Sequence, residues 1–335
     1  MRHFLSTEDW SRPDLQAMID RARVFRDSPA CDALKGKSVA LMFFNPSLRT
    51  RSSFDIGVRQ LGGHAVVLDA RGQTWPVEIE EGAVMDGGPE EHVKEAARVL
   101  SRYVDLIAIR CFPRFEDWTA EREDPLITAY AKYATVPVIN METIVHPCQE
   151  LALMMALQDR LGDVRGKDFL LTWVPHPKPL NTAVANSALL IASKFGMNVR
   201  LLIPDEVYRL DQRYMGAAER FCAEAGTSLT VTTDPEAGYA GAHAVYGKSW
   251  GALPFYGRWD DEAAYRAKGA GFMIDDAKMA LTDDGVVSHC LPMRRNVKIA
   301  DAVADSDAFL GVEEAENRLH VQKAIMERLV ADPSR

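Results

Sequence analysis

The sequence predicts an α/β fold with two open parallel-sheet domains that carry helices on both faces and are joined by crossing helices. Short apolar runs typical of buried strands alternate with helical patterns along the whole chain, which favours parallel sheets. At 335 residues the chain is too long for one ordinary core, so two domains are expected. We place them at residues 1–148 and 149–313, with a terminal helix at about 314–335 that packs back onto the first domain.

The first domain is expected to begin with an amphipathic helix at 7–26, N-capped by Thr7. The apolar run 39–44 predicts a buried strand, and the spacing of Phe54, Val58 and Leu61 predicts a helix after it. Further strands are expected at 64–68, 105–109 and 136–140, and a further helix at 124–133.

Residues 69–90 carry several glycines and prolines and predict a long mobile loop, with Trp75 near its middle. Loops of this length often act as lids or as arms between subunits. The helix expected after this loop, at 90–103, has an apolar face. Its inward residues would be Val93, Ala96, Leu100 and Tyr103.

The second domain follows a long apolar helix at 149–161, which we expect to cross between the domains. Asn181 is the expected N-cap of a helix that reaches Phe195, and a strong terminal helix is expected at 314–330. Six short apolar runs predict the strands of this domain, at 169–173, 199–203, 229–231, 244–246, 285–287 and 308–310.

Composition narrows the class of function. The net charge of −9 argues against a nucleic-acid or anionic-membrane surface. Five cysteines, an odd number without metal-ligand spacing, suit a reducing cytosol and predict no metal site. No signal-peptide core and no membrane span are predicted, so we expect a cytoplasmic protein. No Gly-x-Gly-x-x-Gly follows a strand, which removes the main support for a dinucleotide cofactor.

The stretch Ser47-Leu48-Arg49-Thr50-Arg51 lies where the first strand feeds a helix N-terminus. Unpaired backbone N–H groups and the positive end of the helix dipole meet there and favour an anion. The arginines and hydroxyls add charge-assisted donors. A solvated basic turn is the alternative interpretation.

Other polar residues also follow predicted strands, where ligands bind in open parallel sheets. The third strand ends at Arg110, and the fourth leads to Glu142, His146 and Gln149. In the second domain, one strand leads to Lys248-Ser249-Trp250-Gly251 and another to His289-Cys290-Leu291-Pro292-Met293-Arg294-Arg295. Each group alone is weak evidence, but together they predict one anion site.

Three of these segments resemble known motifs. Ser47-Leu48-Arg49-Thr50-Arg51, His146-Pro147-Cys148-Gln149 and His289-Cys290-Leu291-Pro292 are similar to the Ser-x-Arg-Thr-Arg, His-Pro-x-Gln and His-Cys-Leu-Pro motifs of the aspartate/ornithine carbamoyltransferase family. The likeness covers essentially the whole chain. It implies a carbamoyl-phosphate domain, a domain for the amine substrate, no cofactor, and a homotrimer with shared active sites.

The resemblance also implies roles for individual residues. Those implied in catalysis are Arg49, Thr50, Arg110, His146, Gln149 and Arg294. Those implied to hold carbamoyl phosphate are Ser47, Leu48, Arg49, Thr50, Trp75 of a neighbouring subunit, Arg110, His146, Pro147, Cys148, Gln149, Cys290, Leu291, Arg294 and Arg318. The departing phosphate can accept the proton of the attacking amine, so no protein base is required.

The amine substrate is indicated by departures from the ornithine pattern. Where ornithine enzymes carry Asp-x-x-x-Ser-Met-Gly, this chain has Tyr246-Gly247-Lys248-Ser249-Trp250-Gly251. A cation in place of the acid suggests an α-amino group that is masked. An aspartate-type substrate would also require cations, so the charge alone does not decide and the wider match is needed. Trp75-Pro76, His176-Pro177-Lys178-Pro179 and Glu314-Ala315-Glu316-Asn317-Arg318 further resemble the branch of the family that acts on N-acetylated ornithine in arginine biosynthesis.

In that branch, the resemblance places Glu142 and Lys248 on acetylornithine, with Asn181 as a weaker candidate. Glu90 would discriminate the acyl group by repelling a succinyl tail. Lys298 matches a lysine that is carboxylated in some members, and its alternative is an ordinary surface lysine. Trp75 could instead be a hydrophobic plug, and Glu90 a first-turn acid.

Several competing functions remain open at this stage. Within the class, the chain could act on N-succinylornithine or on ornithine. From other classes, it could be a non-catalytic small-anion binder or regulatory subunit, or, with less support, a dehydrogenase.

Overall fold

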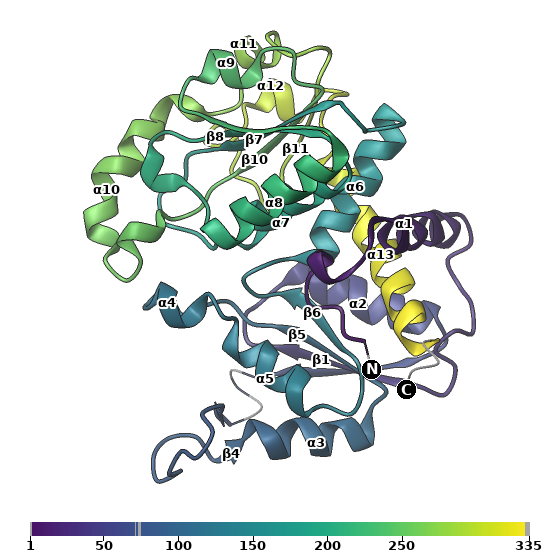
Figure 1. Cartoon of the computed structure of the whole chain (residues 1–335). Helices are drawn as coiled ribbons and strands as arrows, with labels where there is room; N and C mark the ends of the chain where they lie inside the picture. The colour runs from purple at the N-terminus through teal and green to yellow at the C-terminus, as the bar shows by residue number, and fades with distance from the viewer. Residues whose placement is uncertain (1, 71, 73–74, 332–335) are drawn as a thin grey trace. The chain divides into compact units, whose positions relative to one another are not determined.

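The computed structural model describes residues 2–70, 72 and 75–331, which form two compact units (Figure 1). The first unit contains Met1–Arg114, Thr119–Cys148 and Asn317–Arg335, and the second contains Phe115–Trp118 and Gln149–Glu316. Three of the boundaries fall inside helices, namely α4 (Trp118–Glu121), α6 (Pro147–Leu161) and α13 (Gly311–Val330). These helices join the two units covalently.

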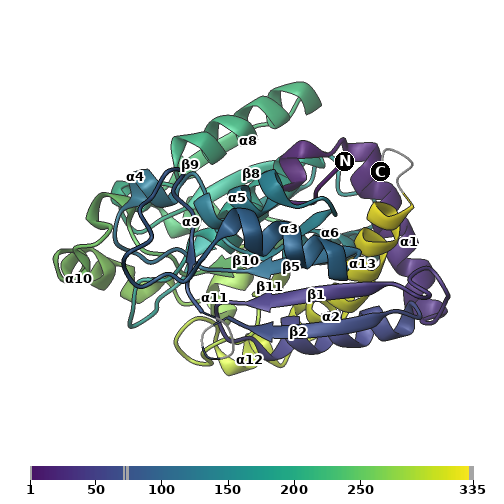
Figure 2. The ribbon, with the colours of Figure 1, turned by 90° about the horizontal axis from the view of Figure 1, so that it is seen from below.

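The first unit is built on a four-stranded parallel sheet of order β2-β1-β5-β6. Its strands are β1 (Ser38–Phe43), β2 (His64–Asp69), β5 (Leu106–Arg110) and β6 (Val138–Glu142). Its helical segments are η1 (Thr7–Asp9), α1 (Arg12–Asp27), α2 (Leu48–Gln60), α3 (Val93–Tyr103), α4 (Trp118–Glu121), which begins in the second unit, and α5 (Pro125–Tyr133). Figure 2 shows β1 and β2 side by side, with α2 running along them.

Alternation along the central strands explains why helices cover both faces of this sheet. Ala40 and Met42 point to one face, where they pack with Val93 and Ala97 of α3 and with α5. The intervening residues of β1 are also buried, so the strand is apolar on both faces, as a central parallel strand requires.

The second unit is built on a five-stranded parallel sheet of order β11-β10-β7-β8-β9. Its strands are β7 (Asp168–Trp173), β8 (Asn198–Leu202), β9 (Leu229–Thr232), β10 (Ala244–Lys248) and β11 (Val286–Ser288). Its helical segments are α7 (Ala183–Lys194), η2 (Glu206–Tyr208), α8 (Gln212–Ala225), α9 (Pro235–Tyr239), η3 (Leu253–Phe255), α10 (Trp259–Lys268), η4 (Gly269–Phe272), α11 (Asp276–Met279) and α12 (Asp301–Ala304). Figure 1 shows α7 and α8 on one face of this sheet and α9 and α11 on the other. The predicted fold class is therefore confirmed.

The segment Phe115–Trp118 packs on the second unit although its chain neighbours belong to the first. The indole of Trp118 donates to Asp211 Oδ2 at 2.7 Å, and the Trp259 indole donates to the Phe115 carbonyl at 3.1 Å. Rings of Phe115, Trp118, Tyr256 and Trp259 lie against one another. Nothing in the sequence pattern predicted that this segment would pack with the second unit.

Some expected details are wrong near the chain's ends. The first long helix begins at Arg12, because Ser11 caps it by accepting from the Asp14 N–H, whereas Thr7 opens a separate short turn. The expected strand at 308–310 is reduced to a single bridge between Phe309 and Val287. The terminal helix ends at Val330, and residues 332–335 lie outside the described residues.

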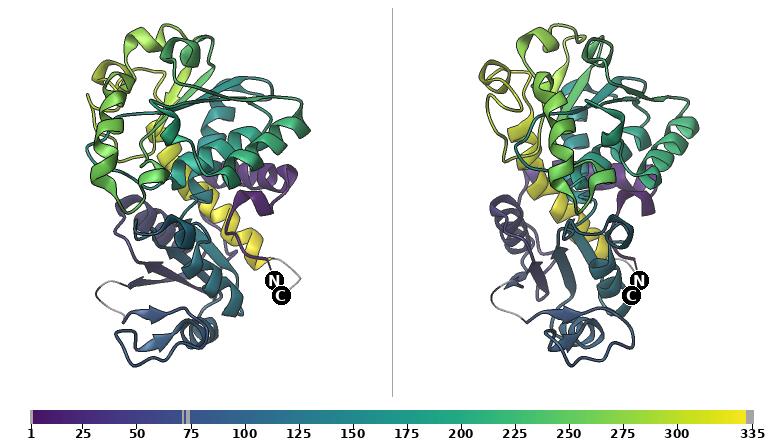
Figure 3. Two further views of the ribbon diagram at one scale, coloured as in Figure 1. Left: turned by 60° about the vertical axis from the view of Figure 1, so that its left-hand side comes forward. Right: turned by 90° about the vertical axis from the view of Figure 1, so that its left-hand side faces the viewer.

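The stretch 69–90 and the helix after it also differ from expectation. The stretch contains β3 (Val77–Glu78), which pairs in parallel with β4 (Glu91–His92), and Figure 3 shows this small pair beside α3. Residues 71, 73 and 74 of the expected loop lie outside the described residues. In α3, Ala97 and Ser101 are buried, whereas Tyr103 is 74% exposed rather than inward. No helix in the described part of the chain is both long and apolar enough to cross a membrane.

Candidate functional site

The carboxyl ends of three adjacent strands bring the predicted residues of the first unit together. Phe43 at the end of β1 pairs in register with Arg110 of β5, and Arg110 pairs with Glu142 of β6. Parallel strands end at the same edge of a sheet, so these side chains share one edge. Arg110 is at the centre of this edge.

Arg110 is a buried guanidinium held from two sides. Its Nη1 donates to Glu142 Oε2, and its guanidinium lies 4.6 Å from the centre of the Phe112 ring. Its Nε is buried and has no hydrogen-bond partner among the described residues. A fixed, buried guanidinium with an N–H to donate is suited to an anionic ligand.

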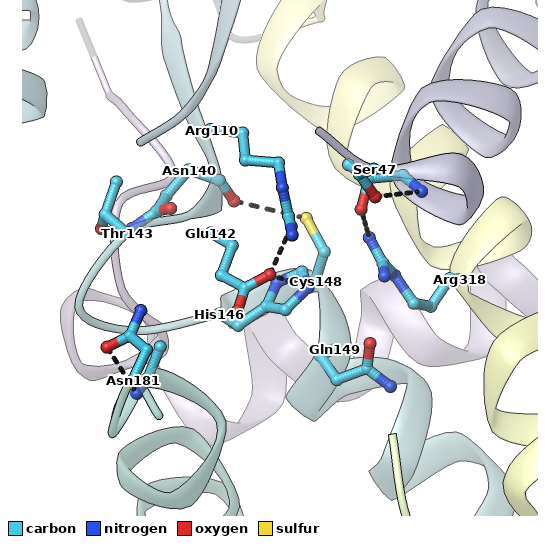
Figure 4. Close-up of polar contacts among 12 residues, drawn as sticks. Ser47, Arg110, Asn140, Glu142, Thr143, His146, Cys148, Gln149, Asn181 and Arg318 are labelled. Carbon is cyan, nitrogen blue, oxygen red and sulfur yellow. Dashed lines mark hydrogen bonds and ion pairs between the residues drawn. The ribbon is translucent and has the colours of Figure 1, made fainter. Parts of the chain in front are cut away.

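His146 lies beside this pair, immediately before the first residue of α6. It is buried, and its Nε2 is 3.6 Å from Glu142 Oε2 (Figure 4). The next turn is anchored by Cys148, whose Sγ donates to the Asn140 carbonyl at 3.6 Å. The start of α6 thus fixes an imidazole next to the Arg110–Glu142 pair.

The N-terminus of α2 forms the other half of this edge. Ser47 caps the helix by accepting from the Thr50 N–H at 3.2 Å. The buried Thr50 Oγ1 accepts from Arg318 Nη2 at 2.8 Å. This hydrogen bond brings Arg318 of α13 to the start of α2, near Ser47 (Figure 4). Arg49 is partly buried and the side chain of Leu48 is 75% exposed, so any ligand contact at residue 48 would come from its backbone.

Trp75 and Glu90 belong to the small β3–β4 region rather than to this strand edge. The Trp75 side chain is 55% exposed, and its Nε1 donates to Glu91 Oε2 at 2.9 Å. Glu90 is exposed and directly precedes β4. Both side chains are placed to meet a partner from solvent.

In the second unit, cationic groups gather at the ends of β10 and β11. Lys248 is the last residue of β10 and is buried. Lys298 is only 3% exposed, with its Nζ 3.1 Å from His289 Nε2. Burial, with the nearby charge of Lys248, lowers the pKa of Lys298 to about 7. Burial and the same lysines hold the pKa of His289 well below its usual range.

The interpretation of Lys298 as a surface lysine is therefore wrong, because its side chain is buried. The hydrophobic spacing of its loop gave no sign of this burial. Arg294 is exposed, and its charge contributes to the lowered pKa of Lys298. Cys290 and Leu291 are partly buried in the same loop. This loop thus brings Arg294, Lys298 and His289 close to Lys248.

Two other predicted residues of this unit have structural partners. Asn181 accepts from the Ala183 N–H at 3.2 Å, although the formal N-cap of α7 is Thr182, one residue later than expected. Trp250 is buried and its indole donates to the Tyr208 carbonyl at 2.8 Å, so it belongs to the core.

Gln149 is buried at the start of α6, and its Nε2 donates to Glu314 Oε1. Glu314 belongs to a segment that resembles the family branch, but the sequence analysis gave it no individual role. The available signal was helical spacing, since Asn317, Arg318 and Val321 fall on the same face of α13 and are also buried. The neighbouring Glu313 is exposed, so the residue type alone could not show which of the two acids is buried.

Comparison with known proteins agrees with this arrangement. Residues 2–159 match the family model described as the aspartate/ornithine carbamoyltransferase carbamoyl-P binding domain, and residues 179–329 match the Asp/Orn binding domain. An N-acetylornithine carbamoyltransferase of Xanthomonas campestris pv. campestris is 58% identical over 332 residues, covering 98% of each chain.

A solved acetylornithine transcarbamylase complexed with acetylcitrulline superposes with a TM-score of 0.98 at 58% identity. The match covers 99% of this chain and 100% of that one. An N-succinylornithine carbamoyltransferase of Bacteroides thetaiotaomicron is 32% identical over 297 residues, covering 88% of each chain.

The lowered pKa of Lys298 predicts how stability depends on pH. In the unfolded chain a lysine titrates near its ordinary value of 10.5, so between about pH 7 and 10 the unfolded state binds more protons. The free energy of unfolding should therefore rise over this range, and Lys298→Met should reduce that rise. Urea unfolding in bicarbonate-free buffer at several pH values measures it.

Exposed Lys35 supplies the matched control, since Lys35→Met should leave the slope unchanged. Lys323 is also buried, and its pKa is lowered to about 8. It therefore contributes part of the rise in unfolding free energy with pH in every variant. Equal slopes for the wild type and Lys298→Met would contradict a lysine that is uncharged near neutral pH.

Proposed function

The chain belongs to the aspartate/ornithine carbamoyltransferase family, and from that premise we propose that it transfers the carbamoyl group of carbamoyl phosphate to the δ-amine of N-acetyl-L-ornithine. The products are N-acetyl-L-citrulline and phosphate, in a route of arginine biosynthesis. The observation that carries this substrate assignment is the 58% identity to an N-acetylornithine carbamoyltransferase, against 32% to the N-succinylornithine enzyme. Five cysteines, an odd number, favour the reducing cytoplasm as its location.

In this proposal the phosphate lies on the start of α2, where backbone N–H groups and the helix dipole favour negative charge. Ser47, Leu48, Arg49 and Thr50 supply these donors. Arg110 neutralises the dianion from the neighbouring strand end. Support comes from the buried Nε of Arg110 and from the Arg318–Thr50 hydrogen bond, which closes the other side of the helix N-terminus.

The carbamoyl carbonyl is polarised by His146, with help from Thr50, Arg110 and Arg294. These groups stabilise the negative oxygen of the tetrahedral intermediate, and losing one such donor typically reduces the rate ~10²–10³-fold. Pro147 and Cys148 position the first turn of α6 beside the ligand. The buried position of His146 next to Arg110 and Glu142 supports this role.

The carbamoyl NH2 is held by Gln149 and by the backbone carbonyls of Cys290 and Leu291. The departing phosphate accepts the proton that the attacking amine loses, so no side chain acts as a base. This role of Gln149 is supported by its burial at the start of α6.

Acetylornithine is anchored by Glu142 and by Lys248, which meets its α-carboxylate. Glu142 already lies beside Arg110 and His146, next to the carbonyl that the amine must attack. Lys248 is supported by its burial at the end of β10. Asn181 is the weaker member, because its oxygen also accepts from the start of α7.

We further propose a homotrimer in which Trp75 reaches the carbamoyl phosphate of a neighbouring subunit. Support comes from the exposed side chains of this region, with Trp75 at 55% and Val84 at 82%. Exposed apolar side chains on one segment are typical of a contact surface.

The substrate assignment predicts the outcome of a product assay. With carbamoyl phosphate and equal concentrations of N-acetylornithine, N-succinylornithine or ornithine, ureido product should form fastest from N-acetylornithine. Colorimetric ureido detection measures the rates. Faster product formation from free ornithine would reject the assignment, and no product from any amine would favour a non-catalytic anion binder.

The exposed carboxylate of Glu90 predicts an acyl-group preference that one substitution should change. Glu90→Ser removes the repulsion of a succinyl tail, so kcat/KM for N-succinylornithine should rise by at least about tenfold. The matched control is Glu80→Ser, which removes an exposed acid from the same segment. An unchanged preference in Glu90→Ser would exclude Glu90 from the site.

We propose that Lys298 carries a carbamate formed from CO2. A neutral amine is the reactive form, and the pKa of Lys298 lowered to about 7 makes that form abundant near neutral pH. The adjacent Lys248 would stabilise the resulting anion. After exchange into ¹³C-bicarbonate, carbon NMR should show one carbamate resonance in the wild type that is missing in Lys298→Arg. Identical spectra would mean that the lysine is unmodified.

A further inference from the structure

A single buried carboxylate joins three elements of the second unit. Glu314, at the start of α13, is fully buried. It accepts hydrogen bonds from Gln149 Nε2 of α6, from the Tyr246 hydroxyl of β10 at 2.9 Å, and from the Ser288 hydroxyl of β11. Burying a carboxylate is costly unless such donors surround it, so the donors and the acid depend on one another.

Each of these donors belongs to a segment that carries a proposed ligand contact. Gln149 is itself the proposed holder of the carbamoyl NH2. Tyr246 precedes Lys248 by two residues, and Ser288 precedes the loop of Cys290 and Leu291. One acid therefore connects the segments that would bind both substrates.

The chemistry of Glu314 fixes which end of the Gln149 amide faces it. An ionised carboxylate can only accept hydrogen bonds, so the amide nitrogen must be the atom turned toward it. The amide oxygen is then directed to the other side of the group. The amide oxygen can accept a hydrogen bond from the carbamoyl NH2. With the amide nitrogen in the same position, two N–H donors would face each other and no hydrogen bond could form.

We propose that Glu314 is a positioning residue that selects the productive orientation of the Gln149 amide in the proposed carbamoyl transfer. This inference rests on the proposed function. Glu314 touches neither substrate and acts through Gln149. The burial that raises the pKa of Tyr246, together with the charge of Glu314, keeps the tyrosine hydroxyl protonated as a donor.

The first test is Glu314→Gln, which preserves the shape of the side chain and removes its charge. The amide introduced by this substitution can donate as well as accept, so the Gln149 amide is no longer restricted to one orientation. The KM for carbamoyl phosphate should rise roughly tenfold, the expected effect of losing a hydrogen bond to a charged group. The matched control is Glu313→Gln, which removes an exposed acid one residue earlier and should retain wild-type kinetics.

A double-mutant cycle separates positioning from packing. Gln149→Ala alone should also raise the KM for carbamoyl phosphate, and adding Glu314→Gln should then have little further effect on it, because the acid acts through the missing amide. Full additivity of the two substitutions, or wild-type kinetics in Glu314→Gln, would overturn the proposal. Absence of turnover in the wild type would instead reject the proposed function, and the inference with it.

A swapped variant keeps the test decisive if Glu314→Gln folds poorly. Combining Gln149→Glu with Glu314→Gln restores an amide–carboxylate hydrogen bond in the opposite sense. Its Tm should recover relative to Glu314→Gln, while its KM for carbamoyl phosphate stays high, because a carboxylate now faces the phosphate ligand. Recovery of both Tm and KM would show that Glu314 only supports packing and would overturn the proposal.

Discussion

The ion pair between Arg110 and Glu142 is the interaction on which the site of the first unit depends. Both side chains are largely withdrawn from water, and removing one member of such a pair typically costs about 3–5 kcal/mol. The pair persists because adjacent parallel strands place its two members in register at the same sheet edge. The sheet thereby holds a cation for an incoming anion and keeps its counter-charge beside it.

The second unit handles charge differently. There Lys248 and Lys298 lie close to His289, and burial, together with the charges of these neighbours, holds the pKa of Lys298 and of His289 below the usual values. The acid Glu314 belongs to the same unit, but its carboxylate accepts hydrogen bonds from donors of α6, β10 and β11 and does not pair with these lysines in any contact described above. The first unit thus offers Arg110 at its strand ends and the second offers Lys248, which suits a phosphorylated substrate and a carboxylate-bearing amine.

Much of the fold could be predicted from sequence because strands and helices of α/β units carry strong local patterns. The apolar run at 39–44 predicted β1 to within one residue, and the spacing of Phe54, Val58 and Leu61 predicted α2. Positions that depend on distant contacts could not be predicted. Tyr103 is exposed because α3 buries Ala97 and Ser101 instead, and Lys298 is buried by elements remote in sequence. For the site, positions after predicted strands pointed to Arg110, Glu142 and His146, whereas no role was predicted for Glu314, which the helical spacing of Asn317, Arg318 and Val321 could have indicated.

The interleaving of the chain between the units has a consequence for biosynthesis. The first unit contains residues 317–330 of α13, where Lys323 bonds the Phe25 and Pro29 carbonyls and Glu327 pairs with Arg21 at 2.6 Å. These residues follow the whole of the second unit in the chain. The amino-terminal sheet therefore waits, with one flank open, until the second unit has been translated, and a chain that stops before residue 317 would lack the closing helix of this unit as well as Arg318.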